Sequence, residues 1–487
     1  CSQSRGLGDV YKRQGMKDLG GGGLSCVVGE LALDAGFGAN VDLEKVHLKL
    51  KNMAPWEIWV SESQERMMFT VKPENVQKVL DRCNAWDVEA VAIGEVIKEK
   101  RNIVKFNGTE ILNLDLEFTT GGPVYNRPYV LPEIDNLEPT ELPPFPTDLS
   151  ETIRNIVGNP EVSSKDWVIR QYDHEVRGAT AIKPIQGRIG NEVHGDSSVL
   201  KPVEDSWKGL ALTADINPHM MEANPYHGTM SAVEEICRNL ASVGARIDSL
   251  ADCLCFGNPQ RPEIMGQFKS SCEALRDAAT FVDVPYVSGN VSLYNETAEG
   301  AIPPTPVLMG IGIVEDIRKC VTSDMKNKGD IWIVGKSEEQ MGASLYYRTQ
   351  GINCPNVPTT DFDSFIPRME QLIEAIESGE VSACHDVSTG GIALAVIEMC
   401  MGGVGAKINL SGDMRDDLEL FSESNGRWIV QVKPEFEEKF SKRFDFARKI
   451  GHVDNDISFN LSKGAEVRFS IDELRKIWTE PLWKRLA

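Results

Sequence analysis

The feature that most constrains the fold of this chain is an internal repeat. The stretch DLGGGG from Asp18 is matched by DVSTGG from Asp386, and each leads into an apolar run. A second shared signature follows in both copies, because SESQER, which contains Glu62, matches SESNGR, which contains Glu423. The spacing is 44 residues from Asp18 to Glu62 and 37 residues from Asp386 to Glu423. Two ordered matches at similar spacing predict a duplicated domain.

Each copy has the sequence pattern of an α/β domain. The segments RMMFTVK and RWIVQVK alternate apolar and polar residues, as half-buried strands do. The first is followed by PENVQKVLDRC, whose apolar residues recur at helical spacing. Residues 126–164 are rich in proline and acidic residues, which indicates an extended linker. Residues 165–320 form a different α/β unit, with strands expected at GLALTADIN and TPVLMGIGIVED.

The expected fold class is therefore α/β (α+β), and the order of parts is B, linker, A, B. The expected parts are a first B domain over 15–125, a linker over 126–164, an A domain over 165–320, a second B domain over 321–473 and a C-terminal tail over 474–487. Residues 1–14 contain DVYKRQ, which reads back as a transposase adaptor, so we interpret them as an assembly scar. If an A–B pair is the duplicated unit, an A domain is missing in front. An apolar face of the remaining A domain is then expected to be open.

Charge and cysteine content exclude several functional classes. The formal net charge of −22 argues against nucleic acid as the main partner, because bulk phosphate binding needs a basic surface. No apolar run reaches 18 residues, so no membrane span is expected. The eleven cysteines include one C-x-C, at Cys253 and Cys255, without a second pair at zinc-site spacing. Reduced thiols of a cytoplasmic protein are therefore expected.

Two stretches of the first copy carry side chains suited to a ligand. Asp18 precedes four glycines, so its carboxylate could hold Mg²⁺ at a helix N-terminus, or could simply cap that helix. The sequence alone leaves both readings open. Glu62, Ser63 and Gln64 could hydrogen-bond a polar ligand, although for this stretch taken alone a hairpin or strand-end turn with solvated charge is the better explanation.

Two stretches of the A unit are similar in chemistry. SLADCLCFGNP contains Asp252, and VSGNVSLYNE contains Gly289, Asn290 and Ser292. Oxygen ligands and a close-approaching backbone suit phosphate bound through Mg²⁺, where the metal supplies the positive charge. The alternative is two loops rich in turn-forming residues.

Several longer stretches together resemble one family. They are QYDHEVRGATAIKP, NPYHGTMSAVEEICRNLASVGARIDSLADCLCFGNP, PYVSGNVSLYNET, AIPPTPVLMGIGIVED and ACHDVSTGGIALA. They resemble the large synthetase subunit of phosphoribosylformylglycinamidine synthase, of the stand-alone type, from about Gly15 to the C-terminus. The resemblance implies tandem A–B modules of the aminoimidazole ribonucleotide synthetase-like superfamily, with the first A domain missing.

The resemblance also implies a reaction and partners. ATP activates the formamide oxygen of formylglycinamide ribonucleotide, and ammonia then displaces phosphate to give formylglycinamidine ribonucleotide, a step of de novo purine biosynthesis. The ammonia comes from glutamine through a separate glutamine amidotransferase subunit, and a small bridging subunit is a second implied partner. Alternative functions are a small-molecule kinase of the same superfamily and a non-catalytic nucleotide-binding scaffold subunit.

The resemblance assigns roles to individual residues. Asp18 and Asn290 match magnesium ligands, and Asp252 and Gly289 match ATP contacts. Substrate contacts of the family match Glu62, Ser63, Gln64 and Ser292. The catalytic histidines of the family lie in its first A domain, so the catalytic residues of this chain are unknown. The chain by itself is expected to be inactive.

Overall fold

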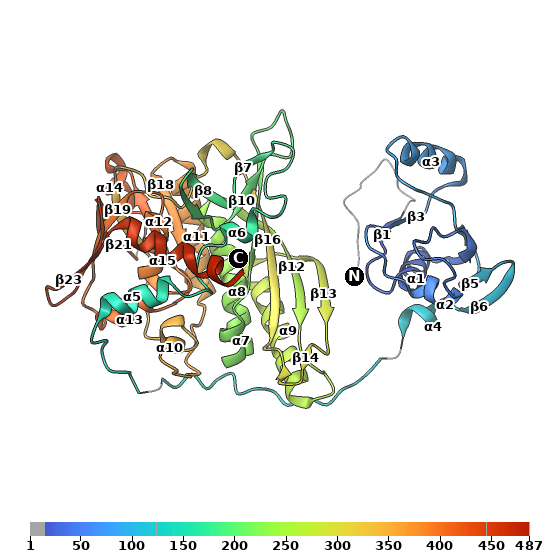
Figure 1. Ribbon diagram of the computed structural model, residues 1–487, viewed down its shortest axis with the longest axis horizontal. Coiled ribbons are helices and arrows are strands. Elements are labelled where there is room, and N and C mark those ends of the chain that lie inside the picture. The colour runs from blue at the N-terminus through green and yellow to red at the C-terminus, as the bar shows by residue number, and fades with distance from the viewer. Residues whose placement is uncertain (1–14, 123, 140, 445, 487) are drawn as a thin grey trace. The chain divides into compact units, whose positions relative to one another are not determined.

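A computed structural model describes residues 15–122, 124–139, 141–444 and 446–486 (Figure 1). The chain divides into two compact units: unit 1 is Cys1–Asn126 and unit 2 is Arg127–Ala487. The interpretation of residues 1–14 as a scar lies outside the described residues. Within the described part of the chain, no helix combines the length and apolar character that crossing a membrane requires.

Unit 1 is a small α/β domain. Its strands are β1 (Met16–Asp18), β2 (Gly38–Asp42), β3 (Met67–Phe69), β4 (Gly94–Ile97), β5 (Arg101–Phe106) and β6 (Thr109–Asp115). They form a two-stranded sheet, β1-β3, and a four-stranded sheet in the order β4-β2-β5-β6. The helices are α1 (Leu24–Asp34), α2 (Pro55–Val60), α3 (Val76–Asn84) and α4 (Leu116–Gly121), with 3₁₀ turns η1 (Leu43–Lys45) and η2 (Pro73–Asn75).

Helix α1 forms the centre of the core of unit 1. Leu24, Val27 and Val28 recur at helical spacing, and all three are buried. They belong to one apolar cluster with Val41 of β2 and Val104 of β5. The helix therefore holds the four-stranded sheet and the loop that precedes α1 in one body.

The first half of unit 2 is built on a six-stranded sheet in the order β13-β12-β16-β11-β10-β7. The strands are β7 (Thr180–Ile182), β10 (Ser198–Leu200), β11 (Gly209–Asp215), β12 (Arg246–Cys255), β13 (Tyr286–Ser292) and β16 (Thr305–Val314). Two small hairpins accompany it, β8 (Ile185–Arg188) with β9 (Asn191–His194) and β14 (Glu296–Thr297) with β15 (Gly300–Ala301). Its helices are α6 (Asp166–Ile169), α7 (Pro218–Ala223), α8 (Pro225–Ser242), α9 (Pro262–Val282) and the 3₁₀ turn η3 (Ile317–Lys319).

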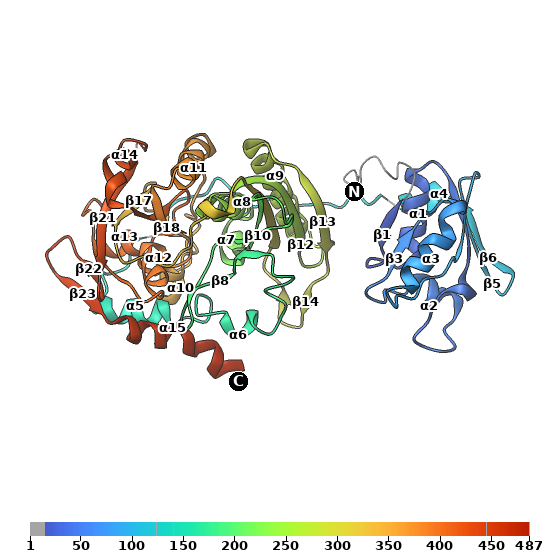
Figure 2. The same cartoon turned by 90° about the horizontal axis from the view of Figure 1, so that it is seen from above.

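Helices α8 and α9 lie side by side on one face of this sheet (Figure 2). Gly310 of β16 faces α8, because an added Cβ there would meet Ile236 at 2.3 Å. Residues at even positions of β16 are thus covered, and those at odd positions point to the other face. On that other face Met309 is 40% exposed and lies opposite Ala214 of β11, which is also exposed. The sheet therefore carries a partly open, largely apolar face.

The second half of unit 2 is built on a seven-stranded sheet in the order β18-β20-β17-β21-β19-β22-β23. The strands are β17 (Asp330–Val334), β18 (Val381–Asp386), β19 (Gly405–Asn409), β20 (Trp428–Val432), β21 (Ala447–Asp454), β22 (Ile457–Asn460) and β23 (Glu466–Phe469). The helices are α5 (Leu149–Val157), α10 (Leu345–Thr349), α11 (Phe362–Glu377), α12 (Gly391–Cys400), α13 (Asp416–Phe421), α14 (Glu437–Ser441), α15 (Ile471–Leu486) and the 3₁₀ turn η4 (Pro434–Phe436).

Strand pairing confirms the duplicated domain. Asp18 lies opposite Met67 in the antiparallel pair β1–β3, and Asp386 lies opposite Trp428 in the antiparallel pair β18–β20. The sheet order β4-β2-β5-β6 is repeated as β21-β19-β22-β23, with the same sense of pairing at each step. One topology thus occurs in both copies.

Two segments differ from the sequence-based prediction. The extended linker predicted for 126–164 contains helix α5, whose N-cap is the Asp148 side chain and whose Ile153 and Ile156 are buried, so the prediction was wrong for these residues. Six of the seven prolines of this segment lie before the helix, the last of them at Pro146, and the seventh, Pro160, follows it. Residues 474–487, set apart as a tail, include most of α15, which packs beside α5 (Figure 1). Trp478 of α15 is buried.

Candidate functional site

In unit 1 the two predicted ligand-binding stretches contact each other at the start of α1. The N–H of Gly22 donates to Oε1 of Glu62 at 2.7 Å. The N–H of Gly20 donates to Oδ2 of Asp18 at 3.0 Å. Helix N-termini present unpaired N–H groups, which attract carboxylates and other anions. The structure therefore brings Asp18 and the Glu62 loop together around one helix N-terminus.

Close packing of the two loops explains a glycine in the first stretch. Gly23 has a φ of 58°, and an added Cβ would meet the carbonyl oxygen of Ser61 at 2.1 Å. The side chain of Arg66 fastens the second loop, because its guanidinium donates to the carbonyls of Ser61 and of Ser63. Glu62, Ser63 and Gln64 remain exposed. Their polar groups are thus available to a ligand on a loop of fixed shape.

The four candidate residues of unit 2 lie on the neighbouring parallel strands β12 and β13. In the strand register Asp252 faces Gly289, Cys253 faces Asn290 and Cys255 faces Ser292. A Cβ at Gly289 would meet Oδ2 of Asp252 at 2.9 Å, so the glycine makes room for this carboxylate.

Strand alternation divides these four residues between the two faces of the sheet. Asp252 points toward α9, because its carboxylate lies close enough to Cys272 of that helix to raise the pKa of the thiol. Burial in turn raises the pKa of Asp252 itself. Asn290 and Ser292 lie on the opposite, open face, since side chains of adjacent strand residues alternate. A single ligand reaches both Asp252 and Asn290 only around the edge strand β13.

Local hydrogen bonds already engage two of these side chains. Asn290 donates from Nδ2 to Sγ of Cys253 at 3.4 Å, and Ser292 donates from Oγ to Oδ1 of Asn295 at 3.2 Å. The oxygens of Asp252 and Asn290 are hard donors that suit Mg²⁺. Asp18 and the Glu62 loop belong to unit 1, whereas Asn290 belongs to unit 2. Their convergence on one ligand stays a prediction.

The second copy repeats the loop geometry of the first in a buried setting. Oε1 of Glu423 accepts N–H groups of Gly390 at 2.8 Å and of Leu345 at 2.9 Å. Arg427 donates to the carbonyls of Ser424 at 2.9 Å and of Ser422 at 2.6 Å. Burial raises the pKa of Glu423 to about 7 and lowers the pKa of Arg427 to about 9.

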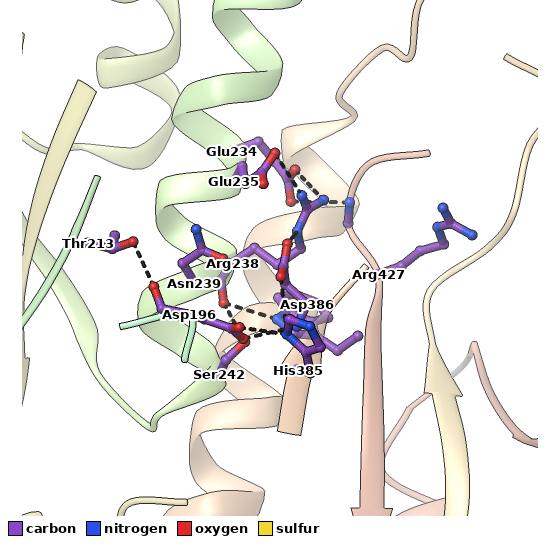
Figure 3. Close-up of polar contacts among 12 residues, drawn as sticks. Asp196, Thr213, Glu234, Glu235, Arg238, Asn239, Ser242, His385, Asp386 and Arg427 are labelled. Carbon is purple, nitrogen blue, oxygen red and sulfur yellow. Dashed lines mark hydrogen bonds and ion pairs between the residues drawn. The ribbon is translucent and has the colours of Figure 1, made fainter. Parts of the chain in front are cut away.

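A buried cluster of charges surrounds Asp386 in this second copy (Figure 3). Arg238 of α8 donates from Nε to Oδ2 of Asp386 at 3.2 Å and from Nη1 to Oε2 of Glu234 at 2.9 Å. Oδ2 of Asp196 accepts the backbone N–H of Asp386 at 3.0 Å. Sequence analysis missed Asp196 and Arg238. The available signal was Asp196 in HGDSSV, an acidic residue directly after a glycine and before a strand.

His385 lies in the same cluster. Its Nδ1 is 2.6 Å from Oδ1 of Asp196, and its Nε2 is 3.2 Å from Oε2 of Glu398. Burial alone would lower the pKa of His385, but these two carboxylates outweigh it and hold that pKa well above its usual value. Ligand-type atoms of Asp196, His385 and Asp386 lie within 4.8 Å of one another. The side chains of Arg238 and His385 supply the positive charge that balances these carboxylates, so the geometry of the cluster is explained without a metal ion.

Comparison with known proteins assigns the family. The family model described as AIR synthase related protein, C-terminal domain, matches residues 10–107 and again 321–462, and the corresponding N-terminal domain model matches residues 194–314. The chain belongs to the AIR synthase related proteins. The double match of the C-terminal domain agrees with the duplication, and the AIR synthase related domains confirm the predicted tandem α/β modules.

Curated proteins similar to this chain include PurL subunits of phosphoribosylformylglycinamidine synthase. Phosphoribosylformylglycinamidine synthase subunit PurL of Thermoplasma volcanium is 37% identical over 482 residues, which cover 96% of this chain and 62% of that protein. PurL of Thermococcus sibiricus is 38% identical over 463 residues, which cover 94% of this chain and 63% of that protein. The chain thus spans less than two thirds of the length of these curated relatives.

A solved structure has the same fold. Thermotoga maritima PurL complexed with ATP superposes with a TM-score of 0.63 at 22% identity, covering 90% of this chain and 63% of that chain. The predicted resemblance to the synthetase subunit is therefore confirmed at the level of homology, and the α/β fold class is confirmed with it.

Proposed function

We propose that the complete protein is an ATP-dependent C–N ligase of purine biosynthesis. It would convert formylglycinamide ribonucleotide and ammonia to formylglycinamidine ribonucleotide, with loss of phosphate from an ATP-activated formamide oxygen. The observation that carries the proposal is the 37% identity to a PurL subunit across 96% of the chain, which includes both B copies and the A unit. Thermotoga maritima PurL has been solved in complex with ATP and in complex with FGAR.

We assign the ligand contacts as the resemblance implies. Asp18 and Asn290 would hold Mg²⁺, which would neutralise triphosphate charge, and Asp252 and Gly289 would contact ATP. The substrate contacts would be Glu62, Ser63, Gln64 and Ser292. Two features support these roles: the exposed, braced loop at the N-terminus of α1, and the pairing of Asn290 and Ser292 on the open sheet face. Asp252 fits less directly, because it points to the helix-covered face.

The open face of the six-stranded sheet supports a further part of the proposal. Leu212 and Ile311 are cross-strand neighbours on it, and Met309 is exposed there. A monomer rarely leaves a contiguous apolar sheet face in water. We propose that this face packs against a second A domain in the complete subunit. A separate glutamine amidotransferase subunit and a small bridging subunit would deliver ammonia, in the cytoplasm.

The test uses the complete protein with its native upstream sequence. ATP consumption is measured with formylglycinamide ribonucleotide and ammonium, with each omitted in turn, and the amidine product is identified by mass spectrometry. Turnover that requires both co-substrates supports the ligase. ATP consumption that transfers phosphate to another small molecule without ammonia favours the kinase, and nucleotide binding without turnover favours the scaffold.

Variants then test the assigned contacts. Asp18→Asn is expected to lower kcat/KM at least about 100-fold, because the loss of a charged metal ligand weakens stabilisation of the transferring phosphoryl group. Asp386→Asn is not used as its control, because Asp386 lies in a buried charge cluster. The matched control is Asp81→Asn on the exposed helix α3, which is expected to leave kcat/KM unchanged. Equal activity of Asp18→Asn and the parent protein would remove Asp18 from the site.

A further inference from the structure

Two thiols lie together on the open face of the six-stranded sheet. Cys253 and Cys255 are two residues apart on β12, so their side chains project from the same face. Their Sγ atoms are 3.8 Å apart, and both residues are half-buried in this chain, without the second A domain proposed to cover this face. This face is the one that α8 and α9 leave uncovered.

The strand neighbours of the two thiols carry no charge. The strand neighbours are Asn290 and Ser292 on β13 and Val307 and Thr305 on β16. Asn290 donates from Nδ2 to Sγ of Cys253 at 3.4 Å, so one thiol is already polarised by a hydrogen-bond donor. The amide oxygen of Asn290 and the hydroxyl of Ser292 are further donor atoms on the same face.

Strand geometry works against a disulfide between these cysteines. Cα atoms two residues apart on a strand are separated by about 6.6 Å, at the upper limit for a disulfide. The sulfur atoms would also have to close from 3.8 Å to a bond of about 2.05 Å. The extended strand therefore holds the two thiols close to each other but apart.

The same separation suits two ligands of one tetrahedral ion. Zinc–thiolate bonds are about 2.3 Å long, and two such bonds at the tetrahedral angle place the sulfur atoms about 3.8 Å apart. Thiolates select soft cations over the hard Mg²⁺. The observed Sγ separation of 3.8 Å equals that tetrahedral edge.

We propose that Cys253 and Cys255 form a two-thiolate site for a soft divalent cation such as Zn²⁺ or Cd²⁺. Each thiol releases its proton to solvent as its sulfur binds the ion. Water completes the coordination. This site is distinct in chemistry from the magnesium role proposed for Asn290, and its existence does not depend on the proposed ligase activity.

Cadmium titration of the full chain tests the site directly. Cd²⁺ bound by thiolates gives an ultraviolet charge-transfer band, which is expected to saturate at one Cd²⁺ per chain. Cys253→Ser and Cys255→Ser are each expected to weaken binding at least about tenfold, since even indirect supporting groups of metal sites have effects of that size. The double variant is expected to abolish the band. The control is Cys26→Ser, an exposed cysteine of unit 1, which should leave the titration unchanged.

Alkylation of the unmodified chain provides a second, residue-level measurement. Zn²⁺ is expected to slow labelling of Cys253 and Cys255 together, as read by mass spectrometry of their shared peptide, while Cys272 on the other side of the sheet labels at an unchanged rate. Excess Mg²⁺ should not reverse this protection. A band that survives in the double variant, or labelling of Cys253 and Cys255 that Zn²⁺ does not slow, would overturn the proposal.

Discussion

The two copies of the duplicated domain build the same loop and place it in opposite environments. Each copy has a Ser-Glu-Ser loop, residues 61–63 in the first copy and 422–424 in the second. Arg66 and Arg427 each donate to two backbone carbonyls of the loop in their own copy. A glutamate of each loop accepts an N–H from the glycine turn, Glu62 from Gly22 and Glu423 from Gly390. Yet Glu62 is exposed and Glu423 is 4% exposed. The hydrogen-bond pattern therefore belongs to the motif, whereas burial comes from what packs on it.

Residues that follow β17 cover the second loop. The N–H of Glu338 donates to Ser424 Oγ at 2.9 Å, and Leu345 donates to Glu423. From the other side, Gly426 donates to Glu234 of α8 at 3.1 Å. Strand β17 also joins β20 to β21 in one sheet. The described residues of unit 1 include no counterpart of β17, and its strands form two separate sheets. A loop closed in the second copy is thereby open to a ligand in the first.

The largest expected effect comes from removing the buried arginine. Arg427→Ala leaves the carbonyls of Ser422 and Ser424 buried without donors and should destabilise unit 2 by about 3 kcal/mol or more. Arg66→Ala, the matched change in the first copy, should cost unit 1 about 1 kcal/mol, because water reaches its loop. Denaturant unfolding with peptide-level hydrogen exchange assigns each loss to its unit. Equal losses in both units would break the comparison.

The next effect depends on pH. The folded pKa of Glu423 is raised from 4.5 to about 7, so the folded state keeps a proton that the unfolded chain releases. The stability contributed by this proton is full below pH 4.5 and is lost as pH rises to about 7. Glu423→Gln keeps the Oε1 acceptor and removes the charge, so it should stabilise unit 2 above pH 7 by up to about 3 kcal/mol and be neutral near pH 4.

The control for this titration is the exposed glutamate of the first copy. Glu62→Gln keeps an acceptor for Gly22 and should change the stability of unit 1 by less than about 0.5 kcal/mol at either pH. Urea midpoints measured from pH 4 to pH 8 compare the two variants. A flat profile for wild-type unit 2 would show that Glu423 does not titrate in this range.

The sequence predicted the duplication, but it did not predict the buried charge cluster or the faces on which the candidate ligands lie. The similar sequence motifs around Asp18 and Asp386 predicted the duplication. They could do so because the hydrogen bonds within each motif depend on local sequence. The buried cluster of Asp196, Arg238 and His385 was not predictable, because it joins residues far apart in the chain. Nor did the sequence show that Asp252 and Asn290 point to opposite faces, since that depends on a register shift between Leu250 and Ala251 of β12.

The two loops also differ in the residue type at one position where the backbone is left-handed. Gly426 has a φ of 69°, and the matching residue of the first copy is Glu65 with a φ of 61°. Gly426→Ala should destabilise unit 2 by about 1–2 kcal/mol, because side chains disfavour this left-handed region. Its Cβ would also lie 3.1 Å from Nη1 of Arg368, a tight contact. Thermal unfolding of unit 2 measures the loss, and an unchanged midpoint would contradict the expected strain.

The smallest and most informative change is the reverse substitution in the first copy. Glu65→Gly relieves the positive-φ strain of about 1–2 kcal/mol but adds the entropy of glycine to the unfolded chain, about 0.5–1 kcal/mol. We therefore expect unit 1 to gain roughly 0.5–1 kcal/mol from the difference. Glu110→Gly, at a strand position, serves as the control that should only destabilise. If Glu65→Gly also destabilises unit 1, Glu65 makes a compensating contact that Gly426 lacks. The two loops would then differ in more than what covers them.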